Sequence, residues 1–281
     1  MLTFNTDGMI LQRYAFPPPV MYYIMNNVKS VHLIKLYQCC KFFYSKFRRN
    51  IIRHLVVVDD DGPEILNPTI TIIRASNTAL KKLADFWISD SFTLIATYNV
   101  QNTLPTFSHC TIKKLELCDY IKHGEFLMLT EAGTIEELMI KGVFADDGIA
   151  FIPIEDIIVE VPNTKSITIS ESVVSPTTFS SLISLKHRAK FSNLVLKNMT
   201  NAILFENNLM VDFVLKNADI VCDVLISFQL NPGINDLLRE HNFLKNLLSF
   251  NFNYLIALHL QKRKMKLPKR KMKFFKRSVS V

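Results

Sequence analysis

Glycine is scarce in this sequence, with 7 residues among 281. Loops that cradle phosphate groups depend on glycine, because the backbone must approach the ligand closely. Common catalytic motifs are missing too: there is no Gly-x-Ser-x-Gly, no Gly-x-x-x-x-Gly-Lys and no His-Glu-x-x-His. We therefore expect a protein that is not an enzyme and that binds no cofactor.

Cysteine offers no disulfide framework either. The five cysteines are odd in number and irregularly spaced, and the adjacent Cys39 and Cys40 cannot readily bridge each other. Residues 1–16 lack the basic and then apolar pattern of a secretory signal. These features indicate a reducing compartment, so we expect the protein in the cytoplasm, the nucleus or both.

Two groups of potential metal ligands fail to match known motifs. One contains Cys and His residues whose spacing fits no standard zinc site: His109, Cys110, Cys118 and His123. The other, the run of three aspartates at residues 59–61, lacks the alternating ligands and the distal Glu of an EF-hand. We expect buried or edge cysteines and a solvated turn, and no metal site.

The net charge of +8 arises in a short C-terminal segment. Ten basic residues lie between positions 262 and 277, and without them the chain has two more acidic than basic residues. The pattern predicts a slightly acidic body with a basic disordered tail over residues 261–281, typical of nuclear import or loose nucleic-acid contact. The residues expected to act in nuclear import are Lys262, Arg263, Lys264, Lys269, Arg270 and Lys271.

Residues 16–47 combine a helix start signal with a dense apolar pattern. Three prolines follow Phe16, and proline is tolerated in the first turn of a helix. A first short helix with one largely apolar face is predicted by Val20, Tyr23, Ile24 and Asn27. A second helix, which Ser30 can cap, is predicted by Leu33, Leu36, Cys40 and Phe43. Helices this short are usually stable only against something else.

These residues resemble an F-box, most closely the divergent F-box-like families of nematodes. Phe16-Pro17 stands where an F-box begins with Leu-Pro, and Val20 and Ile24 stand where its first helix is apolar. The segment Leu36-x-x-Cys39-Cys40-Lys41-x-Phe43 is similar to the closing Leu-x-x-Val-Cys-Lys-x-Trp of that family.

The resemblance implies a partner and a binding site. An F-box presents an apolar helical face to an adaptor, Skp1 in this family, as a helix-in-groove contact. It places the following residues in that contact: Phe16, Pro17, Val20, Ile24, Leu33, Leu36, Cys40 and Phe43. In the alternative, the same residues pack the helices onto the domain that follows.

Further along the chain, a short apolar pattern recurs. Its four copies are Ile112-x-x-Leu115-x-Leu117, Ile135-x-x-Leu138-x-Ile140, Thr164-x-x-Ile167-x-Ile169 and Phe191-x-x-Leu194-x-Leu196. Their centres are 23, 29 and 27 residues apart, close to the period of leucine-rich repeats, roughly 20–29 residues. Each copy predicts a strand, with returns through residues 125–132, 154–160, 177–190 and 202–216. Such units must stack to bury their faces, and simple βα layering is the alternative.

Additional elements surround the repeats. β-branched and apolar runs predict strands over residues 53–58, 70–74, 92–98 and 220–229. A helix that Thr78 can cap is predicted by Leu80, Leu83, Ala84 and Trp87, and a C-terminal helix is predicted from residues 231–233.

Together these patterns predict an α/β protein: a short N-terminal helical F-box-like module followed by a leucine-rich-repeat-like α/β solenoid with parallel strands. The predicted parts are a disordered leader (1–14), the module (15–48), the repeat domain (50–260) and the tail (261–281).

The function expected is a substrate-receptor subunit of a Skp1-cullin ubiquitin ligase that holds a protein client on the repeat domain. The alternatives are a repeat-type interaction scaffold outside ubiquitin ligation and a basic-tailed nuclear or nucleic-acid-associated protein. We expect no small-molecule substrate. We also expect no membrane partner, because polar residues interrupt the apolar stretch 243–260.

Overall fold

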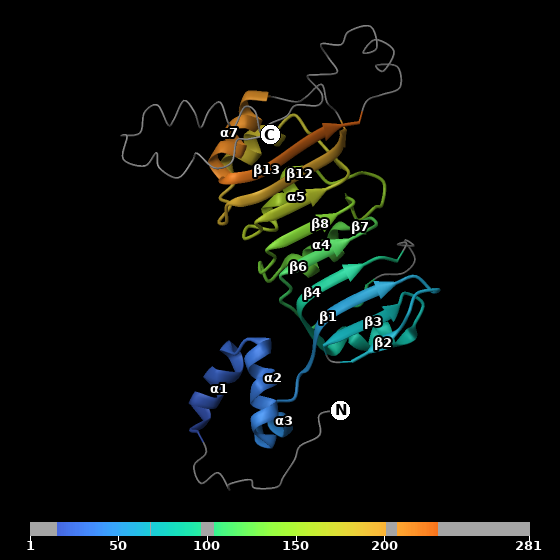
Figure 1. The fold of residues 1–281 in the computed structure, drawn as a ribbon, viewed down its shortest axis with the longest axis vertical. Coiled ribbons are helices and arrows are strands. Elements are labelled where there is room, and N and C mark those ends of the chain that lie inside the picture. The colour runs from blue at the N-terminus through green and yellow to red at the C-terminus, as the bar shows by residue number, and fades with distance from the viewer. Residues whose placement is uncertain (1–15, 68, 97–103, 201–206, 230–281) are drawn as a thin grey trace, which may run out of the picture. The chain divides into compact units, whose positions relative to one another are not determined.

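The computed structural model describes residues 16–67, 69–96, 104–200 and 207–229 and has a mixed α/β fold (Figure 1). The chain divides into two compact units. Unit 1 holds the described residues up to Ile140 together with Phe144–Ile149, and unit 2 holds Lys141–Val143 and the described residues from Ala150 onward. The predicted leader, the helix from residue 231 and the basic tail lie outside the described residues.

Unit 1 begins with three short helices: α1 (Pro18–Asn27), α2 (Ser30–Cys39) and α3 (Lys41–Phe47). Pro18 lies in the first turn of α1, where its missing N–H breaks no helical hydrogen bond. The prediction that Ser30 caps α2 is wrong, because Lys29 holds the N-cap position and Ser30 is the first helical residue. Cys40 has a φ of −149° and therefore separates α2 from α3.

The inward sides of the three helices share one apolar core with the first strands. We call these seven buried residues the junction cluster: Met21, Met25, Leu33, Tyr37, Phe43, Ile51 and Trp87. Leu33 lies at its centre with 0% of its surface exposed. The Trp87 indole also donates from Nε1 to Thr111 Oγ1 at 2.6 Å. Side-chain packing therefore holds the helices against the strands, in addition to the covalent connection between α3 and β1.

The buried side of α1 is not the apolar face predicted from Val20, Tyr23, Ile24 and Asn27. Met21 and Met25 are 7% and 6% exposed, whereas Val20 and Tyr23 are 42% and 69% exposed. A shift of one residue turns the face of a helix by about 100°, so Val20 and Tyr23 lie on another side of α1 than Met21 and Met25. Methionine is flexible enough to fill the irregular space beside the junction cluster.

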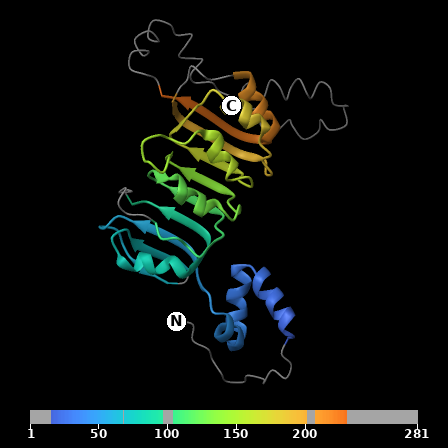
Figure 2. The ribbon, with the colours of Figure 1, turned by 180° about the vertical axis from the view of Figure 1, so that it is seen from behind.

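The strands of unit 1 form a mostly parallel sheet (Figures 1 and 2). They are β1 (Asn50–Val58), β2 (Ile65–Leu66), β3 (Ile70–Arg74), β4 (Phe86–Leu94), β5 (His109–Cys110), β6 (Lys114–Leu117) and β8 (Glu137–Ile140). Their order is β8-β6-β4-β1-β3-β2, with β5 also paired to β4, and β2–β3 is the antiparallel pair. β7 (Ile121–Lys122) leads into α4 (His123–Thr130), which falls where residues 125–132 were predicted to return by a helix.

Two rows of apolar side chains cross this sheet and form its core. In register, one row is Leu55, Phe92, Leu115 and Leu138, and the next is Val57, Leu94, Leu117 and Ile140. Every member of both rows is at most 3% exposed. Each such side chain contributes roughly 1.5–3 kcal/mol by its burial. The strands predicted at residues 112–117 and 135–140 are thereby confirmed.

The helix predicted after Thr78 is a 3-10 helix, η1 (Thr78–Asp85). Asn77 caps it, because Asn77 Oδ1 accepts a hydrogen bond from the Ala79 N–H at 2.9 Å. The assignment of the cap to Thr78 was therefore wrong. Trp87 was predicted on this helix but lies on β4, which starts at Phe86 and so begins before the predicted 92–98.

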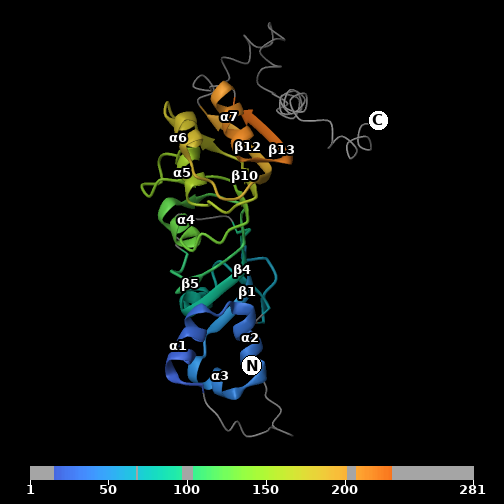
Figure 3. The same cartoon turned by 90° about the vertical axis from the view of Figure 1, so that its left-hand side faces the viewer.

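Unit 2 repeats the strand and helix alternation. Its elements are α5 (Ile154–Val159), β10 (Ser166–Ile169), β11 (Ser172–Val173), α6 (Thr178–Ser184), β12 (Phe191–Thr200), α7 (Asn207–Asn217) and β13 (Ala218–Phe228). β12 pairs in parallel with β10, β11 and β13, and Figure 3 shows α5 and α6 on the same side of these strands. β9 (Val143–Phe144) lies where the two units divide the chain.

The predicted elements of unit 2 are largely confirmed. Strands occur at 166–169, 191–200 and 218–228, and the inward residues of the two copies of the pattern, Ile167, Ile169, Leu194 and Leu196, are at most 2% exposed. Helix α6 ends at Ser184, short of the predicted residue 190. Helix α7 begins at Asn207, and residues 202–206 of that prediction lie outside the described residues.

A bulge in β4 places a polar residue in the core of unit 1. Ile52 pairs with Ile88 and His54 pairs with Ser91, so two residues of β4 lie opposite the single Arg53. One of the two is Ser89, which is 3% exposed and whose hydroxyl has no hydrogen-bond partner in the part of the chain that the structure describes. A buried hydroxyl of this kind has given up its hydrogen bonds to water on folding and gains none to the described part of the protein, which costs stability.

We expect Ser89→Ala to raise the free energy of unfolding by about 1 kcal/mol, because it removes an unsatisfied buried group. The control is Ser172→Ala: Ser172 is 1% exposed and donates from Oγ to the Ile152 carbonyl at 3.0 Å. That variant should lose about 1 kcal/mol. Urea denaturation measures both, and equal losses in the two variants would contradict the assignment.

The surroundings of His187 in unit 2 disfavour the protonated ring and so lower its pKa. It lies 4.3 Å from the Phe191 ring between centroids, and its Nε2 is 2.8 Å from the Thr164 carbonyl oxygen. Burial lowers the pKa of His187 below its usual 6.5, against the opposing effect of the Thr164 hydrogen bond. Folding therefore disfavours the proton, so the stability that this residue contributes is full above the unfolded pKa and is lost as the pH falls through the folded pKa.

Wild-type protein should accordingly lose more stability than His187→Gln between about pH 7.5 and pH 5, the window around a histidine pKa. Urea denaturation at both pH values measures the difference, since the carboxylates contribute equally to both proteins. The same pH dependence in the two proteins would show that His187 carries no folding-linked proton.

Candidate protein-docking surfaces

The outward side of the helices carries an unusual share of exposed apolar side chains. Of fifteen large apolar residues exposed in the described residues, six lie within residues 16–47. We call them the outer apolar set: Phe16 (52% exposed), Val20 (42%), Tyr22 (72%), Tyr23 (69%), Val31 (39%) and Phe42 (41%). Several large apolar side chains exposed on three neighbouring helices make this region a candidate interaction surface.

The predicted adaptor-binding residues divide into three groups. Phe16, Pro17 and Val20 are exposed, and Ile24, Leu36 and Cys40 are half-buried against the junction cluster. Leu33 and Phe43 are buried, at 0% and 8% exposure, beside Ile51 and Trp87. Leu33 and Phe43 therefore hold the helices together and against the strands, and they offer no surface to a partner.

The remaining members of the outer apolar set were absent from the predicted site: Tyr22, Tyr23, Val31 and Phe42. The sequence did contain a signal for part of it, since Phe16, Val20 and Tyr23 are spaced i, i+4 and i+7. Periodicity identifies a face, but it does not reveal whether that face points inward or outward.

The helical region is basic without any acidic counterpart. From Phe16 to Val58 the sequence has no Asp or Glu and seven basic residues: Lys29, Lys35, Lys41, Lys46, Arg48, Arg49 and Arg53. From residue 59 to residue 260 it has fifteen basic and twenty-four acidic residues. The small net charge of the body is therefore the sum of a basic segment, residues 16–58, and an acidic segment, residues 59–260.

Two of these lysines lie where the helix dipole disfavours them. Lys29 is the N-cap of α2 and Lys41 is the first residue of α3, and none of the three helices has an acidic residue in its first turn. The N-terminal end of a helix carries a partial positive charge, so cations there are locally unfavourable. A local conflict of this kind is typical of a functional surface.

Two arginines between α3 and β1 contact aromatic residues of the helices and of β4. The Arg49 backbone N–H donates to the Tyr37 hydroxyl at 2.9 Å, and the Arg49 guanidinium lies 5.8 Å from the centroid of the Trp87 ring. The Arg48 guanidinium lies 5.4 Å from the Tyr44 ring. Burial raises the pKa of Tyr37, which keeps its phenol neutral. The outer apolar set therefore lies on a preorganised support.

The opposite side of the unit 1 sheet is a second candidate surface. Behind the buried rows lie two rows of exposed or half-buried residues: Ile70, His54, Ser91, Lys114 and Glu137, then Ile72, Val56, Thr93, Glu116 and Met139. Lys114 Nζ and Glu116 Oε2 are 3.2 Å apart. We call this mixed surface the open sheet face. Its width and its mixed chemistry suit a protein rather than a small molecule.

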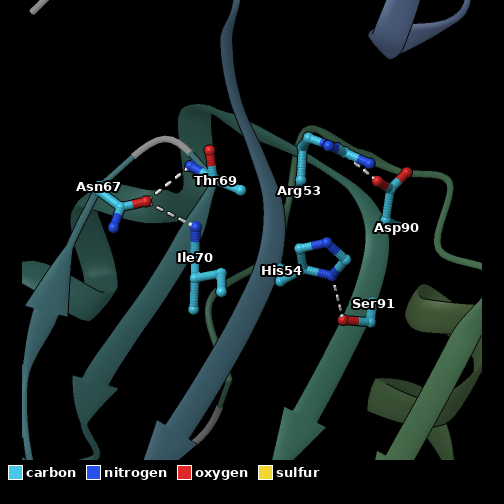
Figure 4. Close-up of polar contacts among 7 residues, drawn as sticks. All are labelled: Arg53, His54, Asn67, Thr69, Ile70, Asp90 and Ser91. Carbon is cyan, nitrogen blue, oxygen red and sulfur yellow. Dashed lines mark hydrogen bonds and ion pairs between the residues drawn. The ribbon is translucent and has the colours of Figure 1, made fainter.

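Polar contacts at the bulge and at the start of β3 include residues of the open sheet face (Figure 4). Arg53 Nε and Asp90 Oδ2 are 2.6 Å apart, and His54 Nδ1 lies 2.9 Å from Ser91 Oγ. At the start of β3, Asn67 Oδ1 accepts from the backbone N–H of Thr69 and of Ile70. The Arg53–Asp90 and His54–Ser91 contacts join β1 to β4, whereas the Asn67 contacts are local to the start of β3.

The His54–Ser91 pair does not form a catalytic triad with its neighbour Asp90. A triad needs a carboxylate that orients the histidine. The Asp90 carboxylate instead pairs with Arg53, as Figure 4 shows. The four residues are best explained as polar contacts that hold β4 to β1 at the bulge.

The Cys and His residues between positions 109 and 123 were not expected to form a metal site. Among the described residues, no three His, Cys, Asp or Glu side chains are close enough to hold a metal ion. Cys110 is half-buried and Cys118 is exposed, and burial raises the pKa of the Cys110 thiol to about 12. The six residues expected to act in nuclear import, Lys262 to Lys271, lie outside the described residues.

Comparison with protein-family models, curated proteins and solved structures finds no match to this chain. The F-box resemblance thus stays a prediction based on the motif residues quoted from 16–43. Within the described residues, every helix is too short or too polar to cross a membrane.

Lys29→Ser should stabilise α2 by about 0.5–1 kcal/mol, because serine at the N-cap can accept a hydrogen bond from the first turn. Lys35→Ser, at an exposed position inside the same helix, is the matched control. It gains no cap and should lose up to about 0.5 kcal/mol of helix propensity. Thermal unfolding compares the two variants. A lower melting temperature for Lys29→Ser than for wild-type protein would contradict the claim that Lys29 is unfavourable at the start of α2.

Proposed function

We propose that this protein is an F-box-type substrate receptor of a Skp1-cullin ubiquitin ligase. In this proposal the helices α1–α3 dock a Skp1-like adaptor, and the strand region holds a protein client. The observation that carries the proposal is the outer apolar set on helices whose inward sides are already packed onto Ile51 and Trp87. An anchored module that still exposes large apolar side chains suits a helix-in-groove contact.

The client would bind to strands of a leucine-rich-repeat-like array. The parallel pairings and the buried pattern residues support such an array in each unit. The open sheet face supplies apolar, hydroxyl and charged side chains over several neighbouring strands. Catalysis would come from partner proteins, and the role of this chain would be to position a client near them.

A second candidate function is an interaction scaffold outside ubiquitin ligation, in which the helices only cap the first strands. The burial of Leu33 and Phe43 together with Trp87 favours it, since capping requires that contact. The two functions differ in what the outward side of α1 does. An adaptor contact needs it, whereas a cap does not.

The double variant Val20→Asp with Tyr23→Asp separates the two functions. Both residues are exposed, so the fold should be retained, unlike with changes at the buried Leu33 or Phe43. We expect wild-type protein to co-purify with a Skp1-like adaptor and the double variant to lose this adaptor. Anchors of such contacts are typically worth about 2 kcal/mol or more each.

The matched control is Ile149→Asp, because Ile149 is 83% exposed and lies outside the helices. It should bind the adaptor as wild-type protein does, with an unchanged melting temperature in all three proteins. Absence of the adaptor from the wild-type preparation would reject the ligase proposal and favour the scaffold.

A further inference from the structure

We propose that α1 and α2 dock on an acidic protein surface, namely an apolar groove bordered by Asp and Glu side chains. The inference rests on the proposed function and adds to it the chemistry of the partner. It concerns the outward side of the two helices, with Val20, Tyr23 and Val31 as apolar contacts and Lys29 and Lys35 as charged ones.

A basic and an apolar side chain share one side of α2. Val31 and Lys35 are four residues apart on α2, so they lie on the same side of the helix, and both are exposed. Lys29 is exposed at the start of the same helix. An apolar contact that is bordered by charge of one sign fits a groove whose border has the opposite sign.

The charge of this surface is segregated from the rest of the chain. Phe16 to Val58 lacks any acidic residue, whereas residues 59–260 have an excess of nine acidic residues. A chain with mixed charges throughout would neutralise these lysines locally. Since the sequence of the helices supplies no carboxylate, any carboxylate that pairs with these lysines would come from another part of the protein or from a partner.

The arrangement favours a protein over an anionic membrane. A helix that lies on a membrane needs a continuous apolar face. In α1 and α2 the most continuous apolar side faces inward, with Met21, Met25 and Leu33 in the junction cluster. The outward side alternates its aromatic residues with exposed Asn26, Asn27 and Gln38. Such a surface matches a protein groove with both apolar and polar contacts.

The dependence of adaptor binding on salt and charge tests the inference. The full chain and a purified Skp1-like adaptor are titrated by calorimetry at about 50 and 300 mM salt, where screening lengths differ more than twofold. Lys29→Glu with Lys35→Glu is compared with Lys81→Glu plus Lys82→Glu, two exposed lysines of η1. An acid at position 29 agrees with the helix dipole, so weaker binding would not reflect a lost helix.

We expect wild-type affinity to fall about tenfold or more between the two salt concentrations. The double variant in α2 should bind about tenfold more weakly at low salt and show little further salt dependence, while the η1 variant should match wild-type protein. Tight binding that is independent of salt and unaffected in both variants would overturn the acidic-groove inference and leave the proposed function intact.

Two other results also decide the question. No adaptor binding at either salt concentration would overturn the proposed function and the inference together. The wild-type chain could instead bind phosphatidylserine vesicles or form a dimer at low salt. If the α2 double variant abolished that vesicle binding or dimerisation but left adaptor binding unaffected, the vesicle or the second copy would be the occupant of this surface. Either outcome would overturn the inference.

Discussion

The junction cluster is the contact on which the N-terminal part of the structure depends. Three helices of seven to ten residues cannot bury their apolar sides by themselves. Ile51 and Trp87, from the first residues of β1 and β4, extend the core of the sheet into the space between the helices. Because the junction cluster buries the inward sides of the helices, the apolar residues that remain exposed on their outward sides are available to a partner.

The same division explains how much of the fold could be predicted from the sequence. The strand pattern was predictable at Leu115 and Leu117, because these residues alternate with the polar Lys114 and Glu116, and such alternation is typical of a half-buried strand. The position of Trp87 was not predictable from periodicity, since the 3-10 helix η1 ends just before it and its spacing from Leu80 and Leu83 mimics a longer helix.

The candidate site was predictable only in part. The motif residues located the module, but burial separated Leu33 and Phe43 from Phe16 and Val20, and burial depends on tertiary contacts that a motif does not contain. The bulge at Ser89 was equally hidden, because one additional residue in a strand leaves no mark on a short apolar pattern. The absence of acidic residues from Phe16 to Val58, in contrast, is visible in the sequence alone.

The structure therefore separates residues that hold the module from residues that can bind. The first group is buried and apolar, and its loss would unfold the junction. The second group combines exposed aromatic residues with lysines at unfavourable positions in their helices. Local instability at a surface is tolerated where binding benefits from it.

Site-specific photo-crosslinking tests this central claim most directly. With a benzoylphenylalanine in place of Tyr23, the full chain should crosslink to a Skp1-like adaptor, while the same group in place of Ile149 should not. Both positions are exposed, at 69% and 83%, so the difference reports docking and not accessibility. Equal crosslinking at the two positions, or none at position 23 in a sample that contains the adaptor, would contradict the claim that the outward side of α1 is the docking surface.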